Sequence, residues 1–249
     1  MSFEARIRKA SETSKSRIVL ALDPEDPDRE KLMQRSINIL EKASEYICAL
    51  KINRQLVLSL GLRNGVDSIV QMAHELSIPT IMDAKLNDVG HTNEFMARSY
   101  MDTGFDAIIA SPVVGWEGGM DSVFKLATAR GKALIMLTYM SNPGAEIFYS
   151  MKSARHGEAP RAVFELFTEL AAEWKAHGLI VGATKPEIIR RVRELAGPRM
   201  AIYSPGIGPQ GGDPKRAIEA GADYLIVGRA IYGAADPADA AKRIRELTG

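Results

Sequence analysis

The chain has 249 residues, of which 46% are hydrophobic and 25% charged, and its formal net charge is +1. This size and balance predict one soluble domain with a full hydrophobic core, and they favour neither nucleic acid nor a membrane as a partner. The only cysteine, Cys48, excludes an intrachain disulfide and fits a protein of the reducing cytoplasm. The first 16 residues carry mixed charge and no apolar core, so we expect no secretion signal there.

Short apolar runs alternate with segments of helical period along the chain. We expect a short helix at about 3–11 and then eight strands, which lie at 17–23, 46–53, the start of 80–88, 106–110, 132–138, 178–183, 200–204 and 223–227. Helical segments follow at 24–43, 66–73, 92–101, 118–128, 163–174, from 186, from 214 and at 237–247, whereas 139–159 is expected to be a long irregular segment. Eight strand–helix units in this length predict a single-domain α/β fold of residues 1–249, a (β/α)8 TIM barrel.

Charged residues stand where the first three predicted strands end. Asp23 ends the first strand, Lys51 the second, and Asp83 and Lys85 the third. Alternate residues of a strand face the same side, so Asp83 and Lys85 should meet, with Cα atoms roughly 6.5–7 Å apart. Alone, an Asp-x-Lys pair is most simply an ion pair at a sheet end. A barrel brings all four groups to the mouth where active sites lie, which favours a catalytic network with a lysine as proton donor.

Two glycine-rich turns follow the seventh and eighth predicted strands. The first contains Gly206, Gly208, Gly211 and Gly212, and the second is Gly228-Arg229. In barrels these two loops commonly bind phosphate, since glycine lets backbone N–H groups approach an anion and arginine adds a permanent charge. The sequence therefore predicts a phosphate site there, without a Walker or dinucleotide-binding motif.

Taken in order, these motifs resemble the orotidine 5′-phosphate decarboxylase family over about 18–231. The matching motifs are Asp83-x-Lys85-x-x-Asp88, preceded by Asp23 and Lys51, then Ser141-x-Pro143-Gly144, Pro205-Gly206-x-Gly208-x-Gln210-Gly211-Gly212-Asp213, and Gly228-Arg229. The resemblance implies decarboxylation of orotidine 5′-monophosphate to uridine 5′-monophosphate in pyrimidine biosynthesis, with neither cofactor nor metal.

The resemblance also implies catalytic roles. Lys85 would protonate C6 of the pyrimidine, Asp83 would face the leaving carboxylate, and Lys51 would bridge the two carboxylates and touch the ribose. Asp88 and Thr92 would reach into the site of a second subunit, so the enzyme would be a homodimer. The family usually carries Ile and often Pro after this Asp, whereas Val89-Gly90-His91 stands here, and the glycine favours a looser turn.

The implied substrate contacts come from several loops. Asp23 would bind a ribose hydroxyl, Ser141 the pyrimidine, and Gln210 would link the base to the phosphate. Gly228 and Arg229 would hold the phosphate under a loop that closes from Pro205. The other residues assigned to substrate binding are Pro143, Gly206, Gly208 and Gly211.

Two alternatives remain open from the sequence. Hexulose-phosphate synthase and keto-gulonate-phosphate decarboxylase share the barrel and a similar acidic strand motif but use magnesium. The Ser141 and Gln210 loops favour the pyrimidine enzyme over them. The second alternative is a barrel that binds a nucleotide as a sensor, which has no need for the Asp-Lys-Asp-Lys set.

Overall fold

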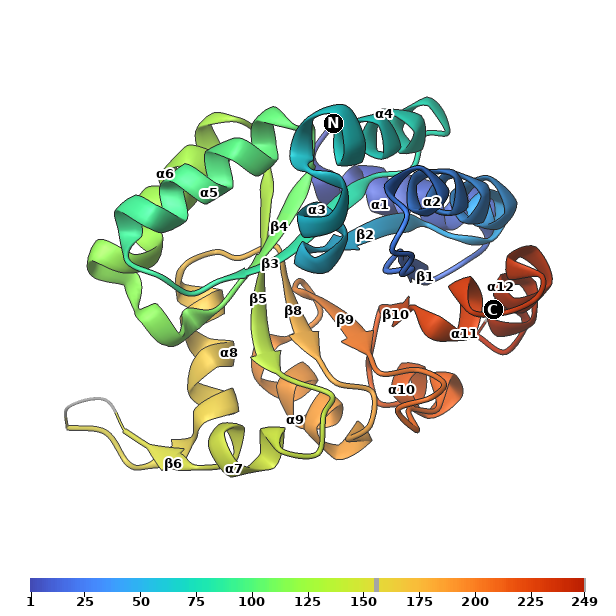
Figure 1. Cartoon of the computed structure of the whole chain (residues 1–249). Coiled ribbons are helices and arrows are strands. Elements are labelled where there is room, and N and C mark those ends of the chain that lie inside the picture. The colour runs from blue at the N-terminus through green and yellow to red at the C-terminus, as the bar shows by residue number, and fades with distance from the viewer. Residues whose placement is uncertain (155–156, 249) are drawn as a thin grey trace.

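A computed structural model describes residues 1–154 and 157–248. Within them, parallel strands form a closed barrel in the order β1-β10-β9-β8-β5-β4-β3-β2, which confirms the predicted fold (Figure 1). Its strands are β1 Ile18–Ala21, β2 Ala49–Asn53, β3 Thr80–Leu86, β4 Ala107–Ala110, β5 Ala133–Tyr139, β8 Gly178–Val181, β9 Ala201–Pro205 and β10 Tyr224–Val227.

Helices surround the barrel (Figure 1). They are α1 Phe3–Ser14, α2 Arg29–Ala43, α3 Arg54–Leu60, α4 Asp67–Glu75, α5 Gly90–Asp102, α6 Asp121–Ala129, α7 Ala145–Tyr149, α8 Val163–Glu173, α9 Pro186–Ala196, α10 Pro214–Glu219, α11 Arg229–Tyr232 and α12 Pro237–Glu246. Short 3₁₀ or π turns lie at Ser44–Tyr46, Leu62–Val66, Pro112–Val114 and Trp116–Met120. None of the described helices combines the length and apolar character needed to cross a bilayer.

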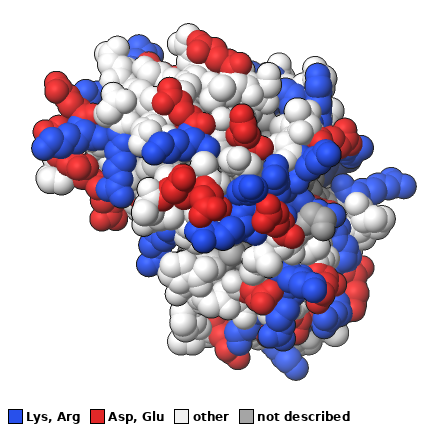
Figure 2. All heavy atoms as spheres, turned by 90° about the vertical axis from the view of Figure 1, so that its right-hand side faces the viewer, with Lys and Arg blue, Asp and Glu red and all other residues white. Residues whose placement is uncertain are grey.

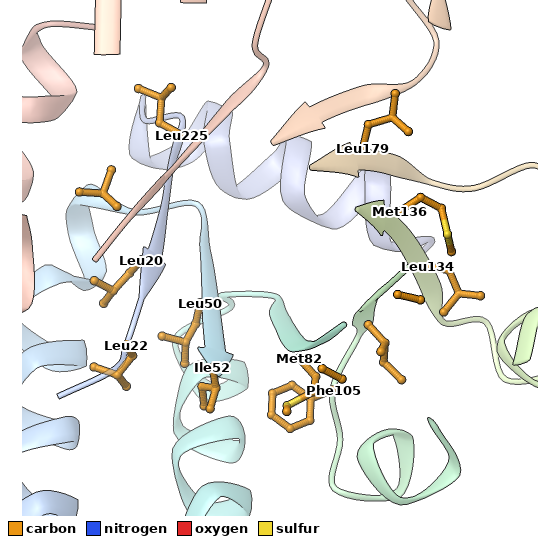
Figure 3. Packing of buried hydrophobic residues seen from close by; sticks show 14 of the residues in the cluster. Leu20, Leu22, Leu50, Ile52, Met82, Phe105, Leu134, Met136, Leu179 and Leu225 are labelled. Carbon is orange, nitrogen blue, oxygen red and sulfur yellow. The ribbon is translucent and has the colours of Figure 1, made fainter. Parts of the chain in front are cut away.

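The strands bury both faces, as expected for a parallel barrel. One set of strand residues packs outward against the helices, including Leu20, Leu50 and Met82 (Figure 3). The alternate residues, such as Val19 and Ile81, fill the barrel interior together with side chains of α1. The same alternation carries on to the carboxyl ends of β2 and β3, where Lys51 and Asp83 take inward positions.

Several short helices and strands were not predicted from the sequence. The helices α3, α7 and α11 have only four to seven residues, too few to display a helical period. The segment 139–159, expected to be irregular, contains α7 and the strand β6 (Lys152–Ser153), which pairs antiparallel with β7 (Arg161–Ala162). The first helix runs on to Ser14, and the helix expected from 118 begins at Asp121 because Gly118 has a positive φ of 66°.

Charge is distributed evenly over the displayed surface. Figure 2 shows acidic and basic side chains interspersed on the side of the molecule that it presents. This agrees with a net charge near zero. That face therefore offers no broad region of a single sign.

Candidate active site

A hollow of about 210 Å³ opens at the carboxyl ends of the barrel strands. Most of the residues predicted to act on the substrate line it together. They are Asp23, Lys51, Asp83, Lys85, Ser141, Pro205, Gly206, Gln210, Gly228 and Arg229. The barrel thus unites side chains from opposite ends of the chain around one pocket.

The four charged groups form a continuous chain of contacts. Asp83 lies at the centre, with its Oδ2 2.9 Å from Lys51 Nζ and its Oδ1 2.6 Å from Lys85 Nζ. Lys51 Nζ also lies 3.6 Å from Asp23 Oδ2. Lys51 therefore bridges two carboxylates, while among the described residues Asp83 is the only carboxylate paired with Lys85.

Burial and pairing act in opposite directions on these groups. Burial disfavours the charged form of Lys51, but the neighbouring Asp83 and Asp23 outweigh it and raise the lysine pKa. Burial likewise favours a neutral Asp83, but the ammonium groups of Lys51 and Lys85 outweigh it and hold the Asp83 pKa below its ordinary value. The network consequently keeps a carboxylate and a buried ammonium charged side by side near neutral pH.

Lys85 has a backbone conformation that the sequence did not predict. Its φ is +45°, in the left-handed region that side chains other than glycine rarely adopt. The pairing of β3 with β4 shifts register between Met82 and Leu86, on either side of it. Local strain of this kind costs about 1–3 kcal/mol and clusters at functional sites. The buried neighbours Ala84 and Leu86 hold the strand in place, so the lysine points into the pocket.

Asn53, the last residue of β2, is a polar neighbour of the network that the sequence analysis missed. Its Nδ2 lies 3.5 Å from Asp83 Oδ2, and its backbone N–H donates to Asp23 Oδ1 at 3.2 Å. The available signal was its position two residues after Lys51, on the same face of the strand.

Apolar side chains and two further polar groups also line the pocket. Ile109, Leu137 and Ile180 provide apolar surface. Ser141 and Gln210 approach each other over Gly206, because a Cβ on that glycine would lie 2.9 Å from Ser141 Cβ and 3.2 Å from Gln210 Oε1. Apolar surface beside two hydrogen-bonding side chains suits a partly polar ligand.

The pocket continues toward the two glycine-rich turns. The loop after β9 folds back on itself, with Gly212 N–H donating to Gly206 O at 2.9 Å and Gly211 N–H to Gly208 O at 2.8 Å. Gly206 has a φ of +103°, which this tight turn requires. Arg229 forms no ion pair within residues 1–154 and 157–248, so its charge remains available to an anion.

Five predicted residues do not line this pocket: Asp88, Thr92, Pro143, Gly208 and Gly211. Asp88 is exposed in the turn after β3, where Asn93 accepts from its N–H and donates to its carbonyl. The looser turn expected at Gly90 stays a prediction. Gly90 begins α5, and a Cβ there would lie 2.9 Å from Gly118 O. Close packing against α6 and its preceding turn therefore explains the glycine.

Metal ligands do not gather in the described parts of the chain. No group of three or more His, Cys, Asp or Glu residues there has the arrangement to hold a metal ion. Both pocket carboxylates instead face ammonium groups.

Sequence comparison places this chain among known proteins. Residues 16–244 match the profile of the orotidine 5′-phosphate decarboxylase / HUMPS family. Orotidine 5′-phosphate decarboxylase of Pyrococcus abyssi is 37% identical over 227 residues, covering 91% of this chain and 96% of the relative. The enzyme of the same name from Pyrococcus furiosus is 39% identical over 229 residues, covering 92% and 96%.

Solved structures agree with these sequence matches. The crystal structure of orotidine 5′-monophosphate decarboxylase from Methanocaldococcus jannaschii, complexed with inhibitor BMP, superimposes with a TM-score of 0.80 at 30% identity. The superposition covers 94% of this chain and 99% of that one. The Pyrococcus horikoshii enzyme gives a TM-score of 0.75 at 36% identity, covering 93% and 98%. The chain therefore belongs to the orotidine 5′-phosphate decarboxylase / HUMPS family.

Proposed function

We propose that the pocket catalyses decarboxylation of orotidine 5′-monophosphate to uridine 5′-monophosphate in pyrimidine biosynthesis, without a cofactor. The observation that carries the proposal is the pairing of Asp83 Oδ1 with Lys85 Nζ, 2.6 Å apart, at the wall of a pocket that Arg229 also lines. Two relatives named orotidine 5′-phosphate decarboxylase, which align with 91% and 92% of this chain, support the proposal.

The charged network supplies the chemistry. Asp83 lies against the substrate carboxylate, and repulsion between the two anions favours loss of carbon dioxide. The C6–carboxylate bond breaks and its electron pair stays on C6. Lys85 then donates its ammonium proton to C6, forming the C–H bond of the product, and regains a proton from solvent. Lys51 keeps Asp83 charged throughout, because it pairs with the other carboxylate oxygen.

The remaining pocket residues hold the nucleotide. Asp23 and Lys51 bind ribose hydroxyls, Ser141 binds the pyrimidine edge, and Gln210 links base and phosphate. Gly228 and Arg229 bind the phosphate, while the loop from Pro205 to Gly211 covers it and Pro143 shapes the Ser141 turn. Binding energy gained at the phosphate closes this loop and orders the charged network around the ring.

A spectrophotometric assay with orotidylate, run with and without EDTA, tests the function. We expect turnover that the chelator leaves unchanged. Activity lost on chelation would favour the magnesium-dependent relatives of this barrel, and binding of uridine 5′-monophosphate without any turnover would favour a nucleotide sensor.

We further propose that the enzyme acts as a homodimer in the cytoplasm, with Asp88 and Thr92 completing the partner's pocket. Asp88 is exposed and does not line the pocket of its own chain. Large apolar side chains lie exposed close to it in sequence, Val89 at 64% and Phe95 at 67%. Exposed apolar groups around a functional polar residue are typical of an interface between copies.

Mixing two inactive variants tests the shared site. If Asp88 acts across a twofold interface, co-expressed Lys85→Ala and Asp88→Ala chains form heterodimers with one intact site and one doubly altered site. The mixture should then recover about a quarter of wild-type activity, while each variant alone is inactive. A mixture that stays inactive would place Asp88 in its own chain's site.

A further inference from the structure

Asn53 is an uncharged residue that contacts both carboxylates of the network. Its backbone nitrogen contacts Asp23, and its side-chain nitrogen contacts Asp83. Asn53 pairs with Asp83 in the β2–β3 ladder, so the two side chains lie next to each other. The Nδ2 atom lies 3.5 Å from Asp83 Oδ2, the oxygen that also accepts from Lys51 at 2.9 Å. The backbone N–H of Asn53 donates to Asp23 Oδ1.

The orientation of the Asn53 amide follows from its second contact. Asn53 is the N-cap of α3, and its Oδ1 accepts the backbone N–H of Gln55 at 3.4 Å. A backbone N–H requires an acceptor, so the amide oxygen faces the helix and the amide NH₂ faces Asp83. The cap therefore fixes a donor toward the carboxylate.

We propose that Asn53 is a positioning residue of the decarboxylation reaction, which fixes the Asp83 carboxylate so that one oxygen faces Lys51 and the other faces Lys85. This inference rests on the proposed function. With Oδ2 held by Lys51 and Asn53, Oδ1 is left to Lys85, the group at the pocket wall. A neutral donor stabilises the carboxylate without adding a third ammonium to the site.

Two substitutions separate this role from helix capping. Asn53→Asp and Asn53→Ser both retain an oxygen that caps α3, but neither presents the amide donor to Asp83. The aspartate also adds a negative charge beside Asp83. Asp236→Ala serves as the matched control, because it removes the N-cap of α12, whose side chain accepts from Ala238 N–H.

We expect kcat for orotidylate to fall about 100-fold in Asn53→Asp and about 10-fold in Asn53→Ser, with KM changed less than about threefold. In Asn53→Asp the acid limb of the kcat–pH profile should move to higher pH by about one unit, since a like charge raises the Asp83 pKa. Asp236→Ala should lower the thermal midpoint and leave kcat and the pH profile unchanged.

A ¹³C NMR titration of the Asp83 carboxyl gives a readout that does not depend on turnover. Its pKa should rise in Asn53→Asp relative to the wild type. Wild-type kcat and an unmoved Asp83 titration in both variants would overturn the positioning role, as would a loss confined to thermal stability. An inactive wild-type enzyme would instead contradict the proposed function, while the titration would still decide the role of Asn53.

Discussion

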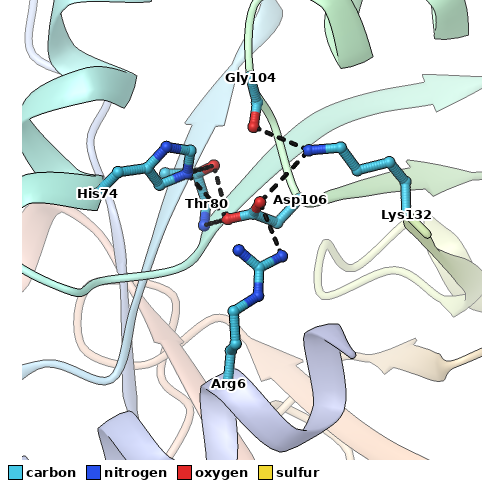
Figure 4. Close-up of polar contacts among 6 residues, drawn as sticks. All are labelled: Arg6, His74, Thr80, Gly104, Asp106 and Lys132. Carbon is cyan, nitrogen blue, oxygen red and sulfur yellow. Dashed lines mark hydrogen bonds and ion pairs between the residues drawn. The ribbon is translucent and has the colours of Figure 1, made fainter. Parts of the chain in front are cut away.

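The barrel holds a buried carboxylate surrounded by cations at each of its two ends. At the carboxyl end, Asp83 lies between Lys51 and Lys85. At the amino end, Asp106 immediately precedes β4 and is 1% exposed. Its Oδ1 contacts Arg6 at 2.8 Å, and its Oδ2 contacts His74 at 3.0 Å and the backbone N–H of Thr80 at 2.9 Å (Figure 4).

The two clusters shift their carboxyl pKa in the same direction. Burial favours a neutral Asp106, but hydrogen bonds from His74 and the Thr80 backbone, together with the Arg6 charge, outweigh it and hold the Asp106 pKa well below its ordinary value. The pKa of Asp83 is likewise lowered, by the charges of Lys51 and Lys85. A depressed pKa therefore does not by itself distinguish a catalytic carboxylate from a structural one.

The two carboxylates, Asp106 and Asp83, differ in the parts of the molecule from which their partners come. The partners of Asp106 come from α1, α4, the start of β3 and Lys132 just before β5, so the carboxylate joins separate segments and closes the base of the barrel (Figure 4). The ion-pair partners of Asp83 come from β2 and β3 themselves, and one of them, Lys85, is partly exposed at a pocket. The first arrangement ties separate segments of the fold together, whereas the second leaves an ammonium group at a pocket wall, as the proposed proton transfer requires.

The largest expected difference in kcat is between two variants that each remove one lysine, Lys85 at the carboxyl end of the barrel and Lys132 at the amino end. Lys85→Ala should lower kcat for orotidylate by at least about 10³-fold, because it removes the proton donor, while the thermal midpoint changes little. Lys132→Ala, which removes the ammonium 3.5 Å from Asp106, should keep wild-type kcat. Steady-state kinetics and thermal unfolding check both variants, and near-normal turnover in Lys85→Ala would refute the assignment.

The next comparison concerns KM and uses two variants that each remove one arginine, Arg229 at the pocket and Arg6 at the amino end of the barrel. Arg229→Ala should raise KM for orotidylate about 100-fold with a smaller change in kcat, because the phosphate loses a charged partner. Arg6→Ala should leave KM unchanged and lower stability instead, since its guanidinium pairs with Asp106. An unchanged affinity of Arg229→Ala for uridine 5′-monophosphate, measured by calorimetry, would show that the phosphate binds elsewhere.

The smallest expected effect is the change in the free energy of unfolding when Asp106 is replaced, and this change depends on pH. Asp106→Asn should lower the free energy of unfolding by about 2 kcal/mol at about pH 7 while kcat stays normal. Because the folded pKa of Asp106 lies below the unfolded value, its stabilisation is fully present above about pH 4 and is lost as pH falls through the folded pKa. Urea unfolding at several pH values should therefore show the wild type and the variant converging on acidification, and a constant difference would contradict the linkage.

The sequence by itself determined the barrel and the main charged positions. Apolar runs alternating with helical periods mark strand–helix units, and parallel strands bring their carboxyl ends to one mouth. Asp23, Lys51, Asp83 and Lys85 were therefore predictable as one cluster, since position along a strand fixes the face and the end at which each side chain lies.

Only the tertiary structure decided how those positions are held. The left-handed backbone of Lys85 lies within a register shift between β3 and β4, and the contact of the Asn53 amide with Asp83 depends on how β2 lies against β3. The Asp106 cluster joins residues as far apart in sequence as Arg6 and Lys132. Local periodicity carries no information on such contacts, because closure of the barrel, and not the neighbouring sequence, brings these segments together.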